Sequence, residues 1–505
     1  MYRKDNPHQM RFENFYLPFG GKLRSDNRWV ILSQQIPWEE IEQGYARHFD
    51  GSDTGTVAKP ARLALGALII KERMGLTDRE TVLQIQENPY LQYFLGFPEY
   101  SDESPFDPSL MVTFRKRFDK ESLAKINDAI VLKARSSQEQ KKDTDSRSDD
   151  NDSRPNAGKL MMDATCTPAD ITYPTDLKLL NEAREKTEEI IDAMHAPFIG
   201  QRKKPRTYRQ KARKDYLAFA KQKKPPTRKI RQAIRKQLGY VHRNLKTIEK
   251  MASEGLLKLL SRRLYRLLLV SQEVHRQQRW MYQQKCHSVS DRIVSLYQPH
   301  VRPMVRGKAK ASVEFGAKIS VSLVDGMSFV DTLSWDAFNE SGDLIMQIES
   351  YKDRFGCYPK SVHVDKIYRT RDNRRYCKKH GIRLSGPPLG RPKQATEANK
   401  EVLAQARRQQ RQDELDRNAI EGKFGQGKRR FTLERIMAKL AETSEAVIMV
   451  SFIVMNLERI LSEILLFVWI VCRSLRMRLW PVRHPVRIGK PEALAPCKIR
   501  VAVAC

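Results

Sequence analysis

Two neighbouring segments rich in β-branched residues place the strongest constraint on the fold of this chain. Residues 315–326 and 328–338 read FGAKISVSLVDG and SFVDTLSWDAF. The Asp325–Gly326 step between them is typical of a hairpin turn. Segments with helical and strand character then alternate over residues 342–386. A hairpin followed by alternating helices and strands predicts an α/β core built around one mixed sheet.

The charge balance of the chain indicates a polyanionic partner. Lysine and arginine number 92 against 60 acidic residues, which gives a net charge of +32. Such an excess is typical of proteins that bind nucleic acid or an anionic membrane surface. The two longest apolar runs, 446–457 and 464–472, are 12 and 9 residues long, whereas a membrane span needs about 20. The first ten residues lack the apolar region of a secretory signal, so we expect a cytosolic protein without a membrane partner.

Composition divides the chain into segments of different character. Two helices are expected at 61–75 and 76–96, joined at Gly75, and Thr77 with Glu80 forms a capping box for the second. This pair is compatible with a DNA-binding helix-turn-helix and equally with an ordinary helical hairpin. The predicted domains are a helical, DNA-binding N-terminal domain (1–135), a flexible linker (136–159), an α/β core (160–200 and 310–475), a basic helical insertion (201–309) and a basic, irregular tail (476–505).

The start of the insertion is strongly basic. Residues 201–250 contain 19 lysines and arginines against two acids, and four aromatic residues lie between them. Surfaces that contact phosphate often have this composition. A solvated charged surface is the alternative, but helices so rich in one charge repel themselves unless an anion neutralises them. We expect nucleic-acid contact here, from Lys203, Lys204, Arg206, Arg209, Lys211, Arg213 and Lys214.

Apolar residues at heptad-like spacing follow the basic segment. They could pack within the insertion or pair with a second subunit. These residues are Leu257, Leu260, Leu264, Leu267 and Val274.

The stretch RNAIEGKFGQGKRRF, residues 417–431, resembles the opening of a phosphate-binding loop. Gly427 and Lys428 follow Gly422 at the spacing of such a loop, but Arg429 stands where a hydroxyl should hold Mg²⁺. The preceding residues are typical of a helix rather than the required strand. We therefore expect no nucleotide site. Read as a helix, the stretch places Arg417, Glu421 and Lys428 on one face.

Three carboxylates have the composition of an oxygen-ligand metal site. Asp163 and Asp365 are each predicted at the end of a strand, and Glu421 lies on the late helix. If the strands are neighbours and the helix packs over them, the three acids converge. Carboxylates with water and substrate phosphate suit Mg²⁺ or Mn²⁺, and two ions about 3.5–4 Å apart clamp both oxygens of a phosphodiester displacement. Arg417 and Lys428 would then hold the phosphate backbone near the ions.

Other residues compete for roles at such a site. Tyr368 lies near Asp365 and could act as a covalent nucleophile, although no accompanying His and Arg set surrounds it. His363 lies on the same strand face as Asp365 but is more often a core residue than a ligand. The competing acids, which turn or post-strand positions suit better, are Asp170, Asp176, Asp325, Asp331 and Asp336.

Three motifs together resemble the bacterial insertion-sequence transposases of the DDE class, in the group around insertion sequence five. The first is MMDATCTPADITYPTDLKLLNEAREKTE with Asp163, and the second is SVHVDKIYRTRDNRRYCKKHGI with Asp365. The third, RNAIEGKFGQGKRR, fits the family signature through Arg417, Glu421 and Lys428. PFDPSLMVTFRKRF also resembles the N-terminal domain of this group. Two positions depart from the family pattern: Glu414 replaces a tyrosine and Ile367 a glycine.

The resemblance implies a fold and a reaction. The core would have the ribonuclease H-like fold, with Asp163, Asp365 and Glu421 as catalytic metal ligands for two Mg²⁺ or Mn²⁺ ions. The enzyme would cut double-stranded DNA at terminal inverted repeats and join the freed 3′-hydroxyl to target DNA, without ATP and without a covalent protein intermediate. Because two DNA ends must meet, the resemblance also implies a homodimer or a larger synaptic complex. It places the protein at the nucleoid in the bacterial cytoplasm.

Two alternatives remain open from the sequence. The chain could be a basic DNA-binding relative whose carboxylates are no longer catalytic. It could also be a metal-dependent nuclease that cuts DNA but does not join it.

Overall fold

The computed structural model describes residues 11–47, 49, 57–139, 155–308, 311–387, 396 and 399–479. The chain forms two compact units, one ending at Arg459 and one beginning at Ile460. Over its described residues the second unit consists of the remaining part of the last helix, α15 (Ala441–Leu479). Most of the predicted tail, from residue 480 onward, and the centre of the predicted linker, 140–154, lie outside the described residues.

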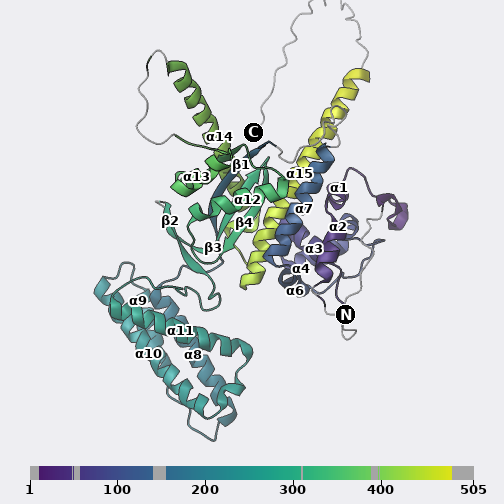
Figure 1. The fold of residues 1–505 in the computed structure, drawn as a ribbon. Coiled ribbons are helices and arrows are strands. Elements are labelled where there is room, and N and C mark those ends of the chain that lie inside the picture. The colour runs from purple at the N-terminus through teal and green to yellow at the C-terminus, as the bar shows by residue number, and fades with distance from the viewer. Residues whose placement is uncertain are drawn as a thin grey trace, which may run out of the picture. The chain divides into compact units, whose positions relative to one another are not determined.

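A mixed sheet forms the centre of the first unit (Figure 1). Its strand order is β2-β3-β1-β5-β6, and β4 pairs with β3. β3 pairs antiparallel with β1, β2 and β4, whereas β1, β5 and β6 run parallel to one another. The structure confirms the predicted α/β fold around one mixed sheet. The strands are β1 (Lys159–Pro168), β2 (Arg302–Lys308), β3 (Ala311–Val324), β4 (Met327–Ser334), β5 (Ser361–His363) and β6 (Arg383–Leu384).

The predicted hairpin is present at the expected residues. Asp325 and Gly326 connect β3 to β4 with φ values of 51° and 82°. Positive φ at both central residues is what a two-residue turn of the hairpin type requires. The strand predicted to end at Asp365 is shorter than expected, because β5 ends at His363 and Lys366–Tyr368 form a 3₁₀ turn, η6.

Helices from distant parts of the chain pack on the sheet. α7 (Lys120–Glu139) contacts β4, α12 (Asp343–Phe355) contacts β1 and β4, and α14 (Lys400–Arg430) contacts β1 and β5. A buried polar network fastens α7 and α15 to β4: the Asn456 side chain donates to Asn127 Oδ1 at 2.8 Å, and both residues donate to the Ser328 carbonyl. The apolar stretch of α15 before Leu461 is almost entirely buried, so this helix closes the core.

The N-terminal part is helical, as predicted. The turn at Gly75 is left-handed, with φ 68°, and ends α3; the Thr77 side chain accepts a hydrogen bond from Glu80 N and begins α4. α3 is buried along most of its length. The second helix, predicted over 76–96, is wrong in extent, because Asn88 is extended and separates α4 from α5, which begins at Pro89. The DNA-binding role of the α3–α4 pair stays a prediction. The helices are α1 (Arg28–Gln35), α2 (Trp38–Ala46), α3 (Ala61–Met74), α4 (Asp78–Glu87), α5 (Pro89–Phe94) and α6 (Leu110–Arg117).

A separate helical body is inserted between β1 and β2. Its helices are α8 (Asp176–His195), α9 (Arg209–Ala220), α10 (Thr227–Ser253) and α11 (Arg262–Gln284), and Figure 1 shows them side by side in teal. α8, which lies within the segment predicted for the core, packs against α10 and α11 through the buried side chains of Leu180, Val241 and Val274. The helical body therefore begins at α8.

The heptad-spaced residues pack inside this body. Leu267 and Val274 are buried, and Leu257, Leu260 and Leu264 pack against a cluster around Ile190 and Met194 on α8. The internal alternative therefore accounts for the spacing. None of the helices within the described ranges combines the length and apolar character needed to cross a membrane.

Candidate active site at the edge of the parallel strands

Asp163 and Asp365 occupy equivalent positions on neighbouring parallel strands. β1 and β5 are paired at Met161 and His363, and each aspartate lies two residues beyond that pair. Side chains two residues apart in extended backbone point to the same face, so both carboxylates lie on one face. The prediction that Asp163 ends its strand is wrong, because β1 continues to Pro168 along β3. What ends there is the pairing with β5.

α14 brings a cation and a third carboxylate to the same place. Arg417 Nη1 lies 2.5 Å from Asp365 Oδ1 and 3.2 Å from Glu421 Oε1. Arg417 and Glu421 are one helical turn apart, so one face of α14 presents both. The Asp365 and Glu421 side chains are about half exposed, whereas Arg417 is more buried. The guanidinium thus links the second and third predicted acids directly.

Asp163 lies in the same electrostatic neighbourhood. Burial raises the pKa of Asp163 to about 6, and the negative charges of Asp365 and Glu340 add to the rise. The Ala164 backbone N–H, which donates to Asp163 Oδ1 at 2.8 Å, and the charge of Arg417 oppose it. A carboxyl group whose ionised form is disfavoured by neighbouring acids is stabilised when a cation joins them. The donor set therefore fits a divalent metal ion.

Glu340 is an acid of this site that the sequence interpretation missed. It lies in η5 (Glu340–Gly342), after β4, and its Oε1 forms an ion pair with Lys318 Nζ at 2.8 Å. Tyr368 is fully buried nearby, and burial together with the charges of Glu340 and Asp163 raises its pKa. A buried phenol held in its neutral form is a poor nucleophile, which agrees with a packing role for Tyr368. No spacing motif connects residue 340 with the other acids.

The five competing aspartates have other partners. Asp331 is nearly fully buried and accepts hydrogen bonds from Ser322, Gln347 and Arg354. The others are ion-paired nearer the surface. The pairs are Asp170 with Arg435 and Lys439, Asp176 with Arg292, Asp325 with Arg135, Asp331 with Arg354, and Asp336 with Arg302.

A second group of potential metal ligands combines His363 of β5 with two aspartates that precede Arg417 on α14. Atoms of His363, Asp413 and Asp416 lie within 4.8 Å of one another. Both carboxylates already pair with cations, since Arg383 donates two hydrogen bonds to Asp413 at 2.7 and 2.9 Å and Lys159 lies 2.7 Å from Asp416. These contacts give the group a structural role, in which it fastens α14 to β1 and β6.

The other predicted basic residues lie further along α14 or in the helical body. Lys428 is half-buried, two turns beyond Glu421 on α14. Lys204 Nζ and Arg209 Nη2 lie 2.5 and 2.6 Å from Asp192 of α8. The Arg206 guanidinium stacks over the Tyr208 ring. The remaining residues of the set are exposed: Lys203, Lys211, Arg213 and Lys214.

Comparison with known proteins identifies the family. Residues 362–458 match the family described as Transposase DDE domain, and residues 18–117 match Transposase domain (DUF772). A protein from Rhizobium meliloti, named Uncharacterized protein ORF8 in nfe locus, is 32% identical over 155 residues, which is 30% of this chain and 68% of that protein. No solved structure matches the chain. The chain belongs to the DDE transposases of insertion sequences.

This transposase is therefore a nucleic-acid-processing enzyme of a family that binds DNA and generally uses divalent metal ions. The first match includes Asp365, Arg417 and Glu421, and the second includes α1 to α6. Residues 118–361, with Asp163, Glu340 and the helical body, lie outside both matches. The place of Asp163 in the site thus depends on its position in the fold.

The raised pKa of Asp163 predicts a pH-dependent stability. Because this pKa is about 6 in the fold against an ordinary value of 3.8, the metal-free protein should lose stability as pH rises from about 4 to about 6. Asp163→Asn should then stabilise the metal-free protein by about 3 kcal/mol at pH 7 and change its stability little near pH 4. Urea unfolding in a chelator, followed by tryptophan fluorescence, measures this.

The matched control is Asp336→Asn, because the Asp336 side chain is 73% exposed; its stability should follow the wild type at each pH. A gain for Asp163→Asn that is the same at pH 4 and pH 7, or a loss at pH 7, would contradict the electrostatic account of the site.

Proposed function

We propose that this transposase cuts double-stranded DNA at the terminal inverted repeats of its element and joins the freed 3′-hydroxyl ends to target DNA. Asp163, Asp365 and Glu421 are the catalytic residues and hold the metal ions, two Mg²⁺ or Mn²⁺. The observation that carries this proposal is the Arg417 guanidinium between Asp365 and Glu421, with Asp163 on the adjacent strand. The β1–β3–β4 arrangement with parallel β5 supports a ribonuclease H-like core.

The residues of the site have distinct tasks in this reaction. Bound metal ions supply Lewis-acid activation of water and of the scissile phosphate. Asp163 and Asp365 hold them from one face of the sheet, and Glu421 closes the set from α14. Tyr368, which is neutral, and Val362 of β5 are both fully buried. The protein interior next to the two aspartates therefore limits the access of water to the metal ions.

Arg417 has a second role beside the carboxylates. In the absence of metal it neutralises Asp365 and Glu421. With metal ions held by the carboxylates, the hydrogen-bond donors of Arg417 would be available to a DNA phosphate, for which the planar guanidinium is well suited. Lys428, two turns further along α14, would contact the backbone on the same side.

The helical body supplies a further DNA surface in this proposal. Lys203, Lys211, Arg213 and Lys214 are exposed and have the charge to contact phosphates. Arg206 stacks on Tyr208, and Lys204 and Arg209 share Asp192, so these three contribute less free charge. Because two element ends must be cut and joined together, the active form is a homodimer or a larger synaptic complex at the bacterial nucleoid.

Removal of either strand aspartate should abolish catalysis but not DNA binding. Asp163→Ala and Asp365→Ala should each lower Mg²⁺-dependent cleavage of DNA that carries the element ends by more than about a hundredfold. Gel-shift affinity should stay close to that of the wild type, and Asp336→Ala should cleave normally. If both variants still cleave, the catalytic assignment is wrong.

Transfer of a labelled 3′ end into a plasmid distinguishes the alternatives. Cleavage with joining supports a transposase reaction. Cleavage without joining would indicate a nuclease, and DNA binding without either step would indicate an inactive relative.

The salt dependence of binding tests the surface of α9. Neutralising Lys211, Arg213 and Lys214 to glutamine should lower the slope of log affinity against log salt by about 0.9 for each phosphate that the protein no longer neutralises, up to about 2.7. Lys204→Gln is the matched control and should change the slope less, because its amino group lies 2.5 Å from Asp192. An unchanged slope for the triple variant would remove α9 from the DNA interface.

A further inference from the structure

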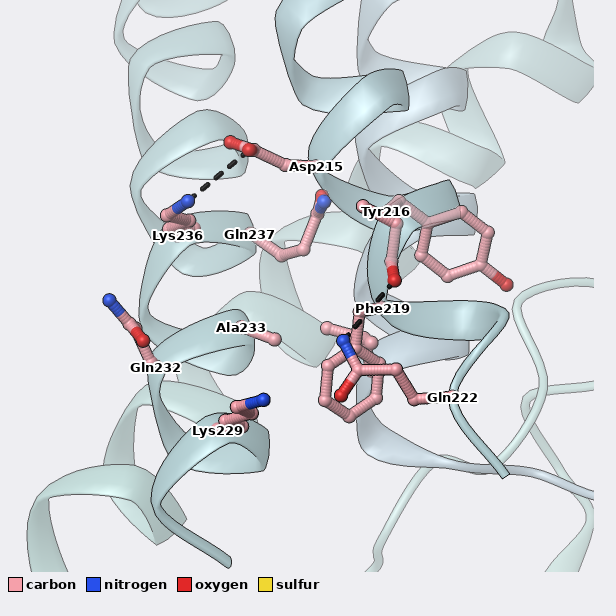
Figure 2. Close-up of a pocket in the computed structure, with 11 residues that line it drawn as sticks. Asp215, Tyr216, Phe219, Gln222, Lys229, Gln232, Ala233, Lys236 and Gln237 are labelled. Atoms are coloured by element: carbon pink, nitrogen blue, oxygen red, sulfur yellow. Dashed lines mark hydrogen bonds and ion pairs between the residues drawn. The ribbon is translucent and has the colours of Figure 1, made fainter. Parts of the chain in front are cut away.

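A small pocket opens between α9 and α10 of the helical body (Figure 2). Its volume is about 200 Å³, below the roughly 300–1,000 Å³ of sites that enclose a drug-sized molecule. It therefore has room for one ring system rather than a whole nucleotide. The pocket lies within the segment that carries 19 lysines and arginines, 201–250.

Gln237, which lines this pocket, carries a buried hydrogen-bond acceptor. Its side chain is 1% exposed, and its Nε2 donates to the Ala212 carbonyl at 3.3 Å. That bond fixes the amide orientation, because the reverse arrangement would place two oxygens against each other. The Gln237 Oε1 has no donor among the residues that the structure describes. A buried acceptor without a donor costs about 1–3 kcal/mol. This oxygen is closed to solvent in the structure, so a small turn of the Gln237 side chain toward the pocket would let it accept from a ligand N–H group and remove that cost.

The other walls suit a flat, aromatic ligand whose attached group is anionic. Phe219 is half-buried and lines the pocket with its ring. Lys229 and Gln222 are exposed, and Figure 2 shows the Lys229 amino group pointing toward Gln222 across the pocket. The Asp215 carboxylate does not oppose an anion strongly, since it pairs with Lys236 at 3.2 Å and with the Tyr240 hydroxyl at 2.9 Å.

We propose that the pocket between α9 and α10 binds one unstacked base of a DNA strand that runs over the helical body. The base stacks on Phe219 and donates an N–H to Gln237 Oε1, while Lys229 contacts the adjoining phosphate. Each of the four bases carries an N–H donor on its pairing edge, so the pocket recognises the presence of a base rather than its identity. This inference rests on the proposed function, because it requires that the insertion binds DNA.

The test compares strands that differ only in their bases. A single-stranded oligonucleotide of cytidines and its abasic analogue carry the same number of phosphates, so electrostatic attraction is equal. Stacking of one base contributes about 1–3 kcal/mol, and the wild-type transposase should prefer the cytidine strand about 5- to 150-fold. Phe219→Ala should remove most of this preference, and Gln237→Leu should reduce it. Binding of the abasic strand should not change.

Trp280→Ala on α11 is the matched control, because Trp280 is an aromatic residue of the same body that is 42% exposed; it should keep the full preference. A strand with a central 2-aminopurine adds a second measurement that does not depend on affinity, since stacking on Phe219 should quench its fluorescence in the wild type but not in Phe219→Ala.

The outcomes separate the two proposals. Equal binding of the cytidine and abasic strands, or a full preference retained in Phe219→Ala, would overturn the base pocket while leaving the DNA surface of the insertion intact. Failure of the wild type to bind either strand or duplex DNA would instead count against the proposed function.

Discussion

The register between β1 and β5 is the constraint on which the candidate site depends. Met161 opposite His363 places Asp163 and Asp365 next to each other, and a slip by one residue would turn one of them to the other face of the sheet. The β1–β5 pairing covers only three residue pairs. The register of β1 is secured on its other edge, where eight consecutive residues pair with β3. Gly316 permits this approach, since a Cβ there would lie 2.1 Å from the Thr167 carbonyl oxygen.

The position of α14 is fixed by a separate set of ion pairs. Arg383 of β6 binds Asp413, and Lys159 of β1 binds Asp416. Arg417 and Glu421 follow on the same helix, so the contacts that hold α14 also determine where these two side chains lie. The group around His363 therefore supports the site by positioning α14. The result is a cluster of acids, balanced in the absence of metal by Arg417 and Lys318, in a protein whose overall charge is strongly positive.

Local features were predictable from the sequence, and features that depend on distant packing were not. The Asp325–Gly326 hairpin and the Thr77 cap are set by neighbouring residues, and the structure confirms both. The extent of β1 beyond Asp163 depends on its pairing with β3, about 150 residues away, which no local pattern reveals. The sequence also could not show that α8 belongs to the helical body, because a helix with one apolar face can pack on a sheet or on other helices. Glu340 lies near the other acids only because the segment that connects β4 to α12 passes there. Charge counts likewise could not show that Lys204 and Arg209 are paired with Asp192.

The most direct test of the convergence of the three acids is localised backbone cleavage by Fe²⁺ bound in place of Mg²⁺. Hydroxyl radicals formed at the ion cut the chain close to it, and mapping of the fragments identifies the nearby segments. Our account predicts cuts near residues 163, 365 and 421 together, suppressed by excess Mg²⁺ and absent in Asp365→Ala. Cuts confined to one of these segments, or located elsewhere in the chain, would contradict a shared metal site.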